Sequence, residues 1–226
     1  MRIDHVVWDW NGTLFDDGDA LVRATVDAFA RSGLTEVTLT AYQQHFTRPI
    51  SEFYNRLAGR VLTAAEQLVL DRHFHDSYTA FLARAAVHPQ AAAALAAWQD
   101  AGRTQSLLSM FPHDRLVALA QFTDIAHFFS HVDGTHADEG PRKEPHLRRH
   151  LDRLDVDPAH VLVVGDSVDD VHAARACGVR ALLYHPPERP LVSHERVRAL
   201  DVPVARGLPE VVRWALTESD REHHGV

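Results

Sequence analysis

The stretch IDHVVWDWNGTL, residues 3–14, decides the fold of this chain. A mostly apolar run from Ile3 to Trp8 ends at Asp9, and Gly12 follows three residues later. Short apolar runs bounded by Asp, Gly, Ser or Pro are typical of buried strands. The stretch therefore predicts a first strand that presents an acidic side chain at its carboxyl end.

Comparable runs recur along the chain and alternate with helical patterns. The further strand-like runs lie at residues 106–108, 126–132, 161–164, 181–184 and 202–205. The helical patterns lie at residues 113–123, 145–155, 168–177 and 207–217. A regular alternation of strands and helices predicts an α/β fold with a doubly wound, Rossmann-like parallel sheet.

One long section, from about residue 19 to residue 97, interrupts this alternation. It carries helical patterning without a convincing strand, and ~70 helical residues are too many for a simple crossover between two strands. We therefore predict a core domain formed by residues 1–17 and 98–226. An all-helical subdomain is expected to be inserted into it at residues 18–97.

The composition narrows the possible partners. The net charge of −8 and the lack of a long Lys/Arg cluster argue against nucleic acid. No stretch approaches the ~20 apolar residues of a membrane span. The single cysteine, Cys177, cannot form an intrachain disulfide within these 226 residues, which fits a reducing, cytoplasmic setting. We expect a cytoplasmic protein that handles a small molecule, either as a monomer or as a homodimer.

Polar residues follow the predicted strands, where an open α/β sheet binds its ligands. Asp9, Ser109 and Asp166 stand at three such strand ends. Lys143 lies in the loop before a helix, and Asp170 lies one helical turn beyond Asp166. Carboxylates, a hydroxyl and an ammonium match the parts of a phosphoryl-transfer site: an attacking oxygen, donors to phosphate oxygens and ligands for a hard cation.

These residues carry a resemblance to the haloacid dehalogenase superfamily. Residues 9–14 look like its first motif, Ser109 like its second, Lys143 like its third, and residues 165–170, GDSVDD, like its fourth. The helical section between the first two motifs is similar to the helical C1-type cap of the family. Within the superfamily, the chain resembles the phosphoglycolate-phosphatase-like hydrolases.

The resemblance implies a role for each of these residues. Asp9 would attack phosphorus and form an aspartyl-phosphate. The phosphate would be bound by Gly12, Thr13, Ser109, Met110 and Lys143. Mg²⁺, the implied cofactor, would be held by Asp9, the backbone carbonyl of Asn11, Asp166 and, directly or through water, Asp170. The implied catalytic residues are Asp9, Asn11 and Lys143.

The sequence is less specific about the roles of other polar residues near the motifs. Residues 46–49, Phe-Thr-Arg-Pro, break the helical pattern, so Arg48 is either a surface arginine or a cleft residue that binds a second anionic group. Asp16 and Asp17 are expected at the hinge into the inserted subdomain, where they cap the next helix or touch substrate. Asp169 is expected to be a solvated carboxylate in the first turn of a helix.

Position 11 departs from the pattern of the family. Most of its phosphatases carry a second Asp there, which protonates the leaving group and then activates water, whereas Asn11 can do neither. Such catalysis is worth about 10²–10⁴ in rate. The chain is therefore a slow or specialised phosphatase, acts on a good leaving group such as an acyl phosphate, or relies on another residue such as His113 or a cap residue. We predict that Asn11→Asp speeds the hydrolysis of a simple alkyl phosphate.

The expected function is Mg²⁺-dependent removal of phosphate from a small phosphorylated metabolite, through an aspartyl-phosphate on Asp9. The missing acid–base group leaves a phosphotransferase or a mutase as an alternative, because a longer-lived phosphoenzyme favours transfer to a second acceptor. A phosphate-binding regulatory relative with little turnover is the remaining possibility.

Overall fold

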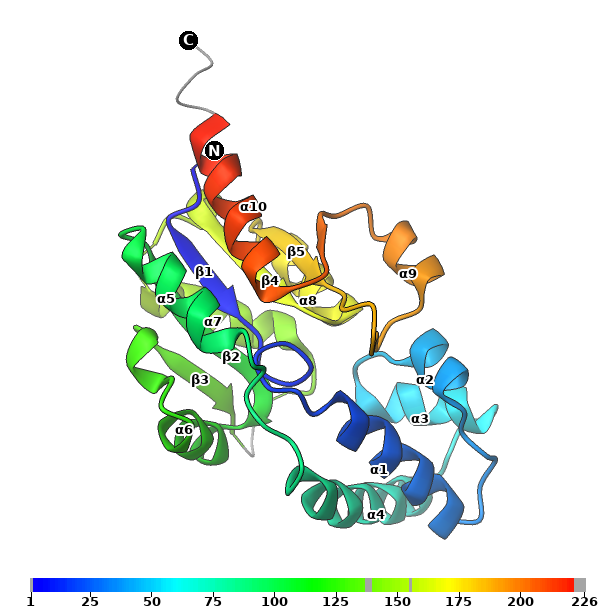
Figure 1. The fold of residues 1–226 in the computed structure, drawn as a ribbon. Coiled ribbons are helices and arrows are strands. Elements are labelled where there is room, and N and C mark those ends of the chain that lie inside the picture. Colours follow the sequence, from blue (N-terminus) through cyan, green and yellow to red (C-terminus); the bar gives the residue numbers. More distant parts are fainter. Residues whose placement is uncertain (1, 137–139, 155, 222–226) are drawn as a thin grey trace.

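Six parallel strands form one sheet in the computed structural model, which describes residues 2–136, 140–154 and 156–221. The strands are β1 (His5–Trp8), β2 (Thr104–Pro112), β3 (Val132–Thr135), β4 (Val161–Gly165), β5 (Arg180–Tyr184) and β6 (Val204–Ala205). Their order across the sheet is β3-β2-β1-β4-β5-β6, so β1 lies between β2 and β4. The predicted doubly wound parallel sheet is confirmed (Figure 1).

Helices cover both faces of this sheet, because the strands carry apolar side chains on both faces. Val6 and Trp8 point to one face and Val7 to the other, as the two-residue period of a strand requires. The first face is covered by α5 (Ala91–Asp100) and α10 (Leu208–Arg221), and the second by α7 (Lys143–Leu154) and α8 (Val168–Ala176). The other elements after β2 are α6 (His113–Phe122), α9 (His194–Ala199) and two 3₁₀ helices, η1 (Ala126–Phe128) and η2 (Pro158–His160).

Four helices between β1 and β2 form a separate layer beyond the carboxyl ends of the strands (Figure 1). They are α1 (Gly18–Arg31), α2 (Leu39–His45), α3 (Ile50–Ala58) and α4 (Ala64–Leu82), and we call them the helical insert. Their apolar sides bury a cluster of their own, which includes Phe29, Tyr42, Phe53 and Leu70. No described helix, here or in the core, has the length and apolar character that crossing a membrane requires.

The helix that follows the insert belongs with the sheet. α5 packs against α10 and β2, and its Trp98 is buried in the same cluster as the strands. The division into a subdomain at 18–97 and a core at 1–17 and 98–226 stays a prediction. The packing of α5 favours ending the inserted part before Ala91.

Two local predictions differ from the structure. The apolar run at 126–132 is not one strand, because its first residues form η1 and β3 begins only at Val132. Asp124, with φ of 57°, turns the chain after α6, and Ile125 then packs into the core, while Phe128 and Phe129 of the run are only partly buried against it. The short helix α9 was not predicted, since its sequence HERVRA is brief and highly charged.

Candidate active site

Asp9 and Asp166 meet because their strands are neighbours. Asp9 follows the last residue of β1, and Asp166 follows the last residue of β4. The strands pair with Trp8 opposite Val164, and the backbone N–H of Asp9 donates to the carbonyl of Val164 at 2.8 Å. The strand order reverses at this place, and open α/β sheets bind their ligands outside such a reversal.

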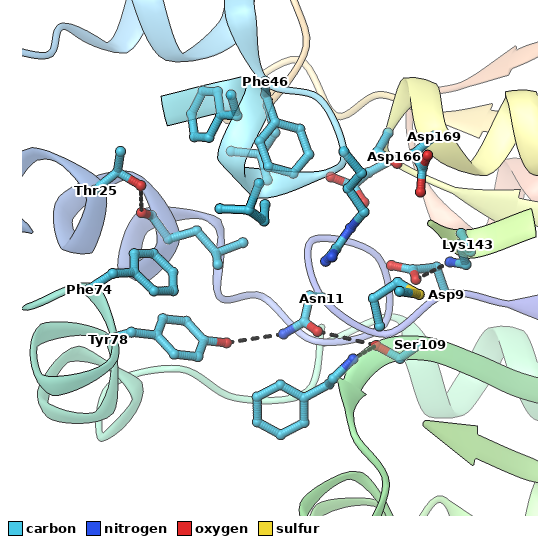
Figure 2. Close-up of a pocket in the computed structure, with 18 of the residues that line it drawn as sticks. Asp9, Asn11, Thr25, Phe46, Phe74, Tyr78, Ser109, Lys143, Asp166 and Asp169 are labelled. Carbon is cyan, nitrogen blue, oxygen red and sulfur yellow. Dashed lines mark hydrogen bonds and ion pairs between the residues drawn. The ribbon is translucent and has the colours of Figure 1, made fainter. Parts of the chain in front are cut away.

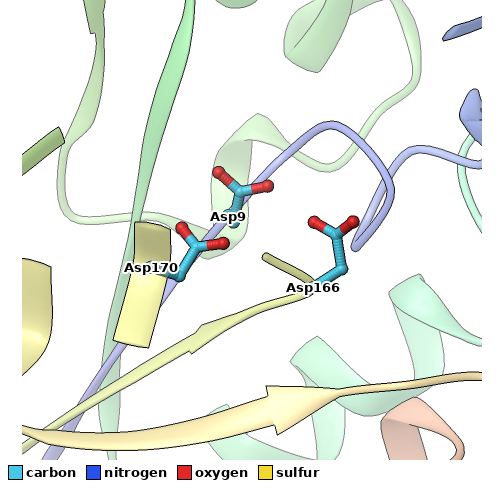
Figure 3. A group of neighbouring side chains, drawn as sticks. All are labelled: Asp9, Asp166 and Asp170. Atoms are coloured by element: carbon cyan, nitrogen blue, oxygen red, sulfur yellow. The ribbon is translucent and has the colours of Figure 1, made fainter. Parts of the chain in front are cut away.

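A third carboxylate, Asp170, completes a cluster with these two (Figure 3). It lies in the first turn of α8, where it forms a reciprocal capping box with Ser167. Each of the three residues offers a carboxylate oxygen, these oxygens all lie within 4.8 Å of one another, and all three residues are buried. Like charges this close repel strongly in a buried site unless cations offset them.

Lys143 supplies one such cation. It is the first residue of α7, it is 3% exposed, and its ammonium contacts the carboxylates of Asp9 and Asp170. Burial alone would lower the pKa of Lys143, but the two carboxylates raise it, so the ammonium stays charged. Burial also opposes the ionisation of Asp170, yet Lys143 and the hydrogen bonds from Ser167 outweigh it and lower the pKa of that carboxyl.

Asp166 forms no ion pair in the part of the chain that the structure describes. Its side chain accepts a long hydrogen bond of 3.4 Å from the Thr13 hydroxyl. Burial, followed by the nearby Asp9 and Asp170, raises the pKa of Asp166 well above its usual range. Burial also raises the pKa of Asp9 to about 7, against the lowering effect of Lys143. A hard divalent cation with oxygen ligands would offset the repulsion between these carboxylates, so the cluster fits an ion such as Mg²⁺.

The cluster lines one end of a cavity of about 330 Å³ between the sheet and the helical insert. The predicted site residues that line this cavity are Asp9, Asn11, Arg48, Ser109, Met110, Lys143, Asp166 and Asp170. Figure 2 shows Ser109 and Lys143 near Asp9 on one side, Phe74 and Tyr78 on the other, and Asn11 between them, joined to both Tyr78 and Ser109. The remaining two predicted residues, Gly12 and Thr13, do not line it and lie against Asp166.

The match to a known family covers most of the chain and all of this cluster. Residues 3–178 match the haloacid dehalogenase-like hydrolase family. The chain belongs to this family. The phosphoglycolate phosphatase of Escherichia coli (strain K12) is 33% identical to it over 122 residues, which cover 52% of this chain and 48% of that protein. The phosphoglycolate phosphatase of Aliivibrio fischeri is 27% identical over 187 residues, covering 76% of this chain and 80% of that protein.

Solved structures of this hydrolase family share the fold at low identity. A predicted phosphatase from Clostridium acetobutylicum gives a TM-score of 0.79 at 16% identity, over 96% of this chain and 100% of the other. A haloacid dehalogenase-like hydrolase from Streptococcus pneumoniae gives 0.78 at 18% identity, over 94% and 98%. These likenesses support the fold alone. Because the chain spans about half the length of the E. coli relative, its activity and substrate are matters for proposal.

The side chain of Asn11 is held by Asp17, a carboxylate that the sequence analysis placed at the hinge. Asp17 is 1% exposed and accepts from the Asn11 amide at 2.6 Å, from the backbone N–H of Gly12 at 2.8 Å and from the Tyr78 hydroxyl at 2.5 Å. The Asn11 side-chain amide also donates to the Tyr78 oxygen at 3.0 Å, and the Ser109 hydroxyl donates to the side-chain oxygen of Asn11 at 3.3 Å. Asp17 precedes α1 but its side chain does not cap it, so its role is to fix the loop that follows Asp9.

Two further expectations change with the structure. His113 is not among the residues that line the cavity, and its Nδ1 accepts from the backbone N–H of Gly134 at 3.2 Å. It therefore does not replace the acid–base group missing at position 11. Asp169 was expected to be solvated, but it is half-buried beside the cavity, and burial raises the pKa of its carboxyl.

The sequence carries one further signal for this site, the rarity of lysine. Of the 23 Lys and Arg residues, Lys143 is the only lysine. A chain that uses arginine everywhere else keeps a compact ammonium at this buried position, where two carboxylates converge on one point charge. The aromatic residues of the helical insert that line the cavity had no comparable signal, because they come from separate helices.

Gly12 offers a direct test of how tightly the site is built. Its φ is +74°, and a Cβ added there would lie 2.5 Å from Oδ2 of Asp166. We expect Gly12→Ala to cost about 1–3 kcal/mol of stability from backbone strain and, in addition, to weaken Mg²⁺ binding by displacing Asp166. Calorimetric titration with Mg²⁺ and denaturant unfolding would measure the two effects. Gly102→Ala is the matched control, because Gly102 has the same φ and open space around it. Unchanged Mg²⁺ affinity in Gly12→Ala would contradict the prediction.

Proposed function

We propose that this hydrolase removes the phosphoryl group from small phosphorylated molecules, with Asp9 as the nucleophile. The observation that carries the proposal is the position of Asp9. Its buried carboxylate lines the cavity, contacts the only lysine of the chain and lies within 4.8 Å of two further carboxylates. That arrangement brings an attacking oxygen, a fixed cation and ligands for a second cation to one point.

In the proposed reaction, a carboxylate oxygen of Asp9 forms a bond to phosphorus while the bond from phosphorus to the leaving oxygen breaks. Lys143 and Arg48 offset the charge of the phosphoryl oxygens, and Ser109 donates a hydrogen bond to one of them. Water then attacks the aspartyl-phosphate and releases inorganic phosphate. Mg²⁺, held by Asp9, Asp166 and the Asn11 backbone carbonyl, would add positive charge at the phosphoryl group.

Asp170 is proposed to act through Lys143 rather than on the metal. One of its oxygens contacts the ammonium of Lys143, and the other accepts from the backbone and the hydroxyl of Ser167 at 3.0 and 2.6 Å. Both oxygens are thus occupied, whereas the Asp166 side chain makes a long contact with Thr13 and no ion pair with a described residue. Asp9 and Asp166 are therefore the proposed direct side-chain ligands.

Trapping the phosphoenzyme tests the proposal. The protein is mixed with p-nitrophenyl phosphate and Mg²⁺, quenched in acid within milliseconds, and digested for mass spectrometry. We expect a phosphoryl group on Asp9, release of p-nitrophenol that requires Mg²⁺, and neither in Asp9→Asn. An intact, folded protein that releases p-nitrophenol without a trapped phosphoenzyme would remove the covalent mechanism. No release at all would leave only a phosphate-binding role.

A phosphotransferase is the second candidate, and Asn11 is the observation that favours it. An amide cannot activate the water that releases the phosphoenzyme, so the aspartyl-phosphate is expected to live long enough to meet another acceptor. Adding glycerol to the p-nitrophenyl phosphate assay separates the two functions. A transferase releases more p-nitrophenol than inorganic phosphate, and the difference appears as glycerol phosphate, whereas a strict hydrolase releases the two in equal amounts.

A further inference from the structure

The cavity extends well beyond the residues proposed to bind phosphate. Its volume of about 330 Å³ is in the range that encloses a drug-sized ligand, for which ~300 Å³ is the lower end. Asp9, Ser109 and Lys143 line one end, and much of the remaining lining comes from the helical insert. The insert, rather than the sheet, therefore surrounds whatever is attached to the phosphate.

Aromatic side chains form two walls of that part of the cavity. Phe46, directly after α2, stacks on Tyr42 with ring centroids 5.4 Å apart and meets the ring of Phe53 edge-on at 5.2 Å. Phe74 and Tyr78 of α4 stack on each other at 5.5 Å, and Figure 2 shows them apart from Phe46 around the open space. Walls of this kind bind flat apolar groups and offer nothing to a hydrated carboxylate.

A carboxylate lies among these walls. Asp71 of α4 lines the cavity near Tyr54 and His75, which line it as well. Of the described lining residues that the insert contributes, Asp71 is the one carboxylate. This part of the cavity therefore favours a ligand with a hydrogen-bond donor or a positive charge.

Two arginines, Arg48 and Arg115, also line the cavity. Arg48 acts electrostatically on Asp9 and Asp169 at the phosphate end and also on Tyr42. Arg115 is exposed, and its guanidinium lies over the ring of Phe111 at 5.0 Å. Arg48 is half-buried and Arg115 is exposed, so neither is a buried partner for an anionic group.

We propose that the preferred substrates are aryl phosphates whose ring carries an ammonium or another hydrogen-bond donor at the end opposite the phosphate. This inference rests on the proposed phosphatase function of the same site. The phosphate binds beside Asp9, the ring lies between Phe46 and Phe74, and the donor reaches Asp71. A phenolate departs with little protonation, so such a substrate also suits Asn11. A two-carbon acid phosphate would instead leave the space between the aromatic walls unfilled.

Three aryl phosphates with near-identical leaving groups test this selectivity. They are the phosphates of tyramine, p-cresol and 3-(4-hydroxyphenyl)propanoate, which carry an ammonium, a methyl group and a carboxylate. We expect kcat/KM to fall in that order, with the ammonium ester at least about tenfold above the carboxylate ester. All three are expected to exceed 2-phosphoglycolate. Calorimetric titration of Asp9→Asn, which cannot form the phosphoenzyme, should give the same order of affinities.

Variants of one helix show whether Asp71 causes the preference. Asp71→Asn is expected to reduce the ratio of ammonium to methyl ester by about tenfold. Asp76→Asn, an equal change of charge at an exposed position of α4, is the control and should keep the ratio. A ratio that survives in Asp71→Asn, or a preference for 2-phosphoglycolate, would overturn the inference.

Acetyl phosphate separates this inference from the proposed function, because its small leaving group does not depend on the aromatic walls. Turnover of acetyl phosphate together with no discrimination among the aryl esters overturns the substrate class and keeps the phosphatase. Failure to hydrolyse acetyl phosphate or any aryl ester, with no trapped phosphoenzyme, removes both.

Discussion

Lys143→Met is expected to lower turnover by at least about 10²–10³ and to destabilise the folded chain by about 3–5 kcal/mol. Methionine keeps the apolar length of the side chain and removes the ammonium. Two buried carboxylates, Asp9 and Asp170, then lose their common cation in a site where like charges already lie within 4.8 Å. Denaturant unfolding and steady-state hydrolysis of p-nitrophenyl phosphate measure the two effects.

Mg²⁺ and a second variant separate the causes of this loss. We expect Mg²⁺ to restore part of the stability of Lys143→Met, because it neutralises the carboxylates, but not the turnover. Lys143→Arg keeps the charge, yet its planar guanidinium is larger than the ammonium that fits between the two carboxylates, so it should recover stability better than activity. A Lys143→Met protein with turnover within tenfold of the wild type would show that the ammonium is not part of the reaction.

The sheet and the carboxylate cluster were predictable because strand ends follow simple rules. A buried strand needs a short apolar run, and parallel strands bring their carboxyl ends to one edge. Asp9 and Asp166 follow two such runs, and β1 and β4 turn out to be direct neighbours. Asp170 lies one helical turn after Asp166, so the helical period alone predicts that it faces the same edge.

The rest of the site depends on contacts that no local pattern encodes. The contacts of Asp17 could not be predicted, because its partner Tyr78 lies 61 residues further along the chain. The aromatic walls combine residues that separate helices present to one space, and each of them alone is compatible with ordinary core packing. Periodicity predicts which face of a helix is buried, but not whether a cavity or a neighbouring helix lies against that face.

Exchanging the residues at positions 11 and 17 is expected to separate two effects of Asn11: its hydrogen bond to Asp17 and its lack of an acid–base group. Asn11→Asp alone replaces the amide that donates to Asp17 at 2.6 Å with a second carboxylate, so we expect a loss of about 2–3 kcal/mol of stability. Any gain in alkyl phosphate hydrolysis would then come in a less stable protein. Asn11→Asp combined with Asp17→Asn restores one donor and one acceptor between the positions and moves the carboxylate to position 11.

The double variant should therefore regain stability to within about 1 kcal/mol of the wild type and hydrolyse an alkyl phosphate about 10²-fold faster. A double-mutant cycle on unfolding free energies, with kcat/KM for ethyl phosphate, measures both. Asp16→Asn is the control, because it changes the same charge at an exposed neighbouring position whose contact with Arg189 is weak. If the double variant is folded and still slow on ethyl phosphate, the amide at position 11 is not what limits this enzyme. Any selectivity for good leaving groups must then come from the cavity itself.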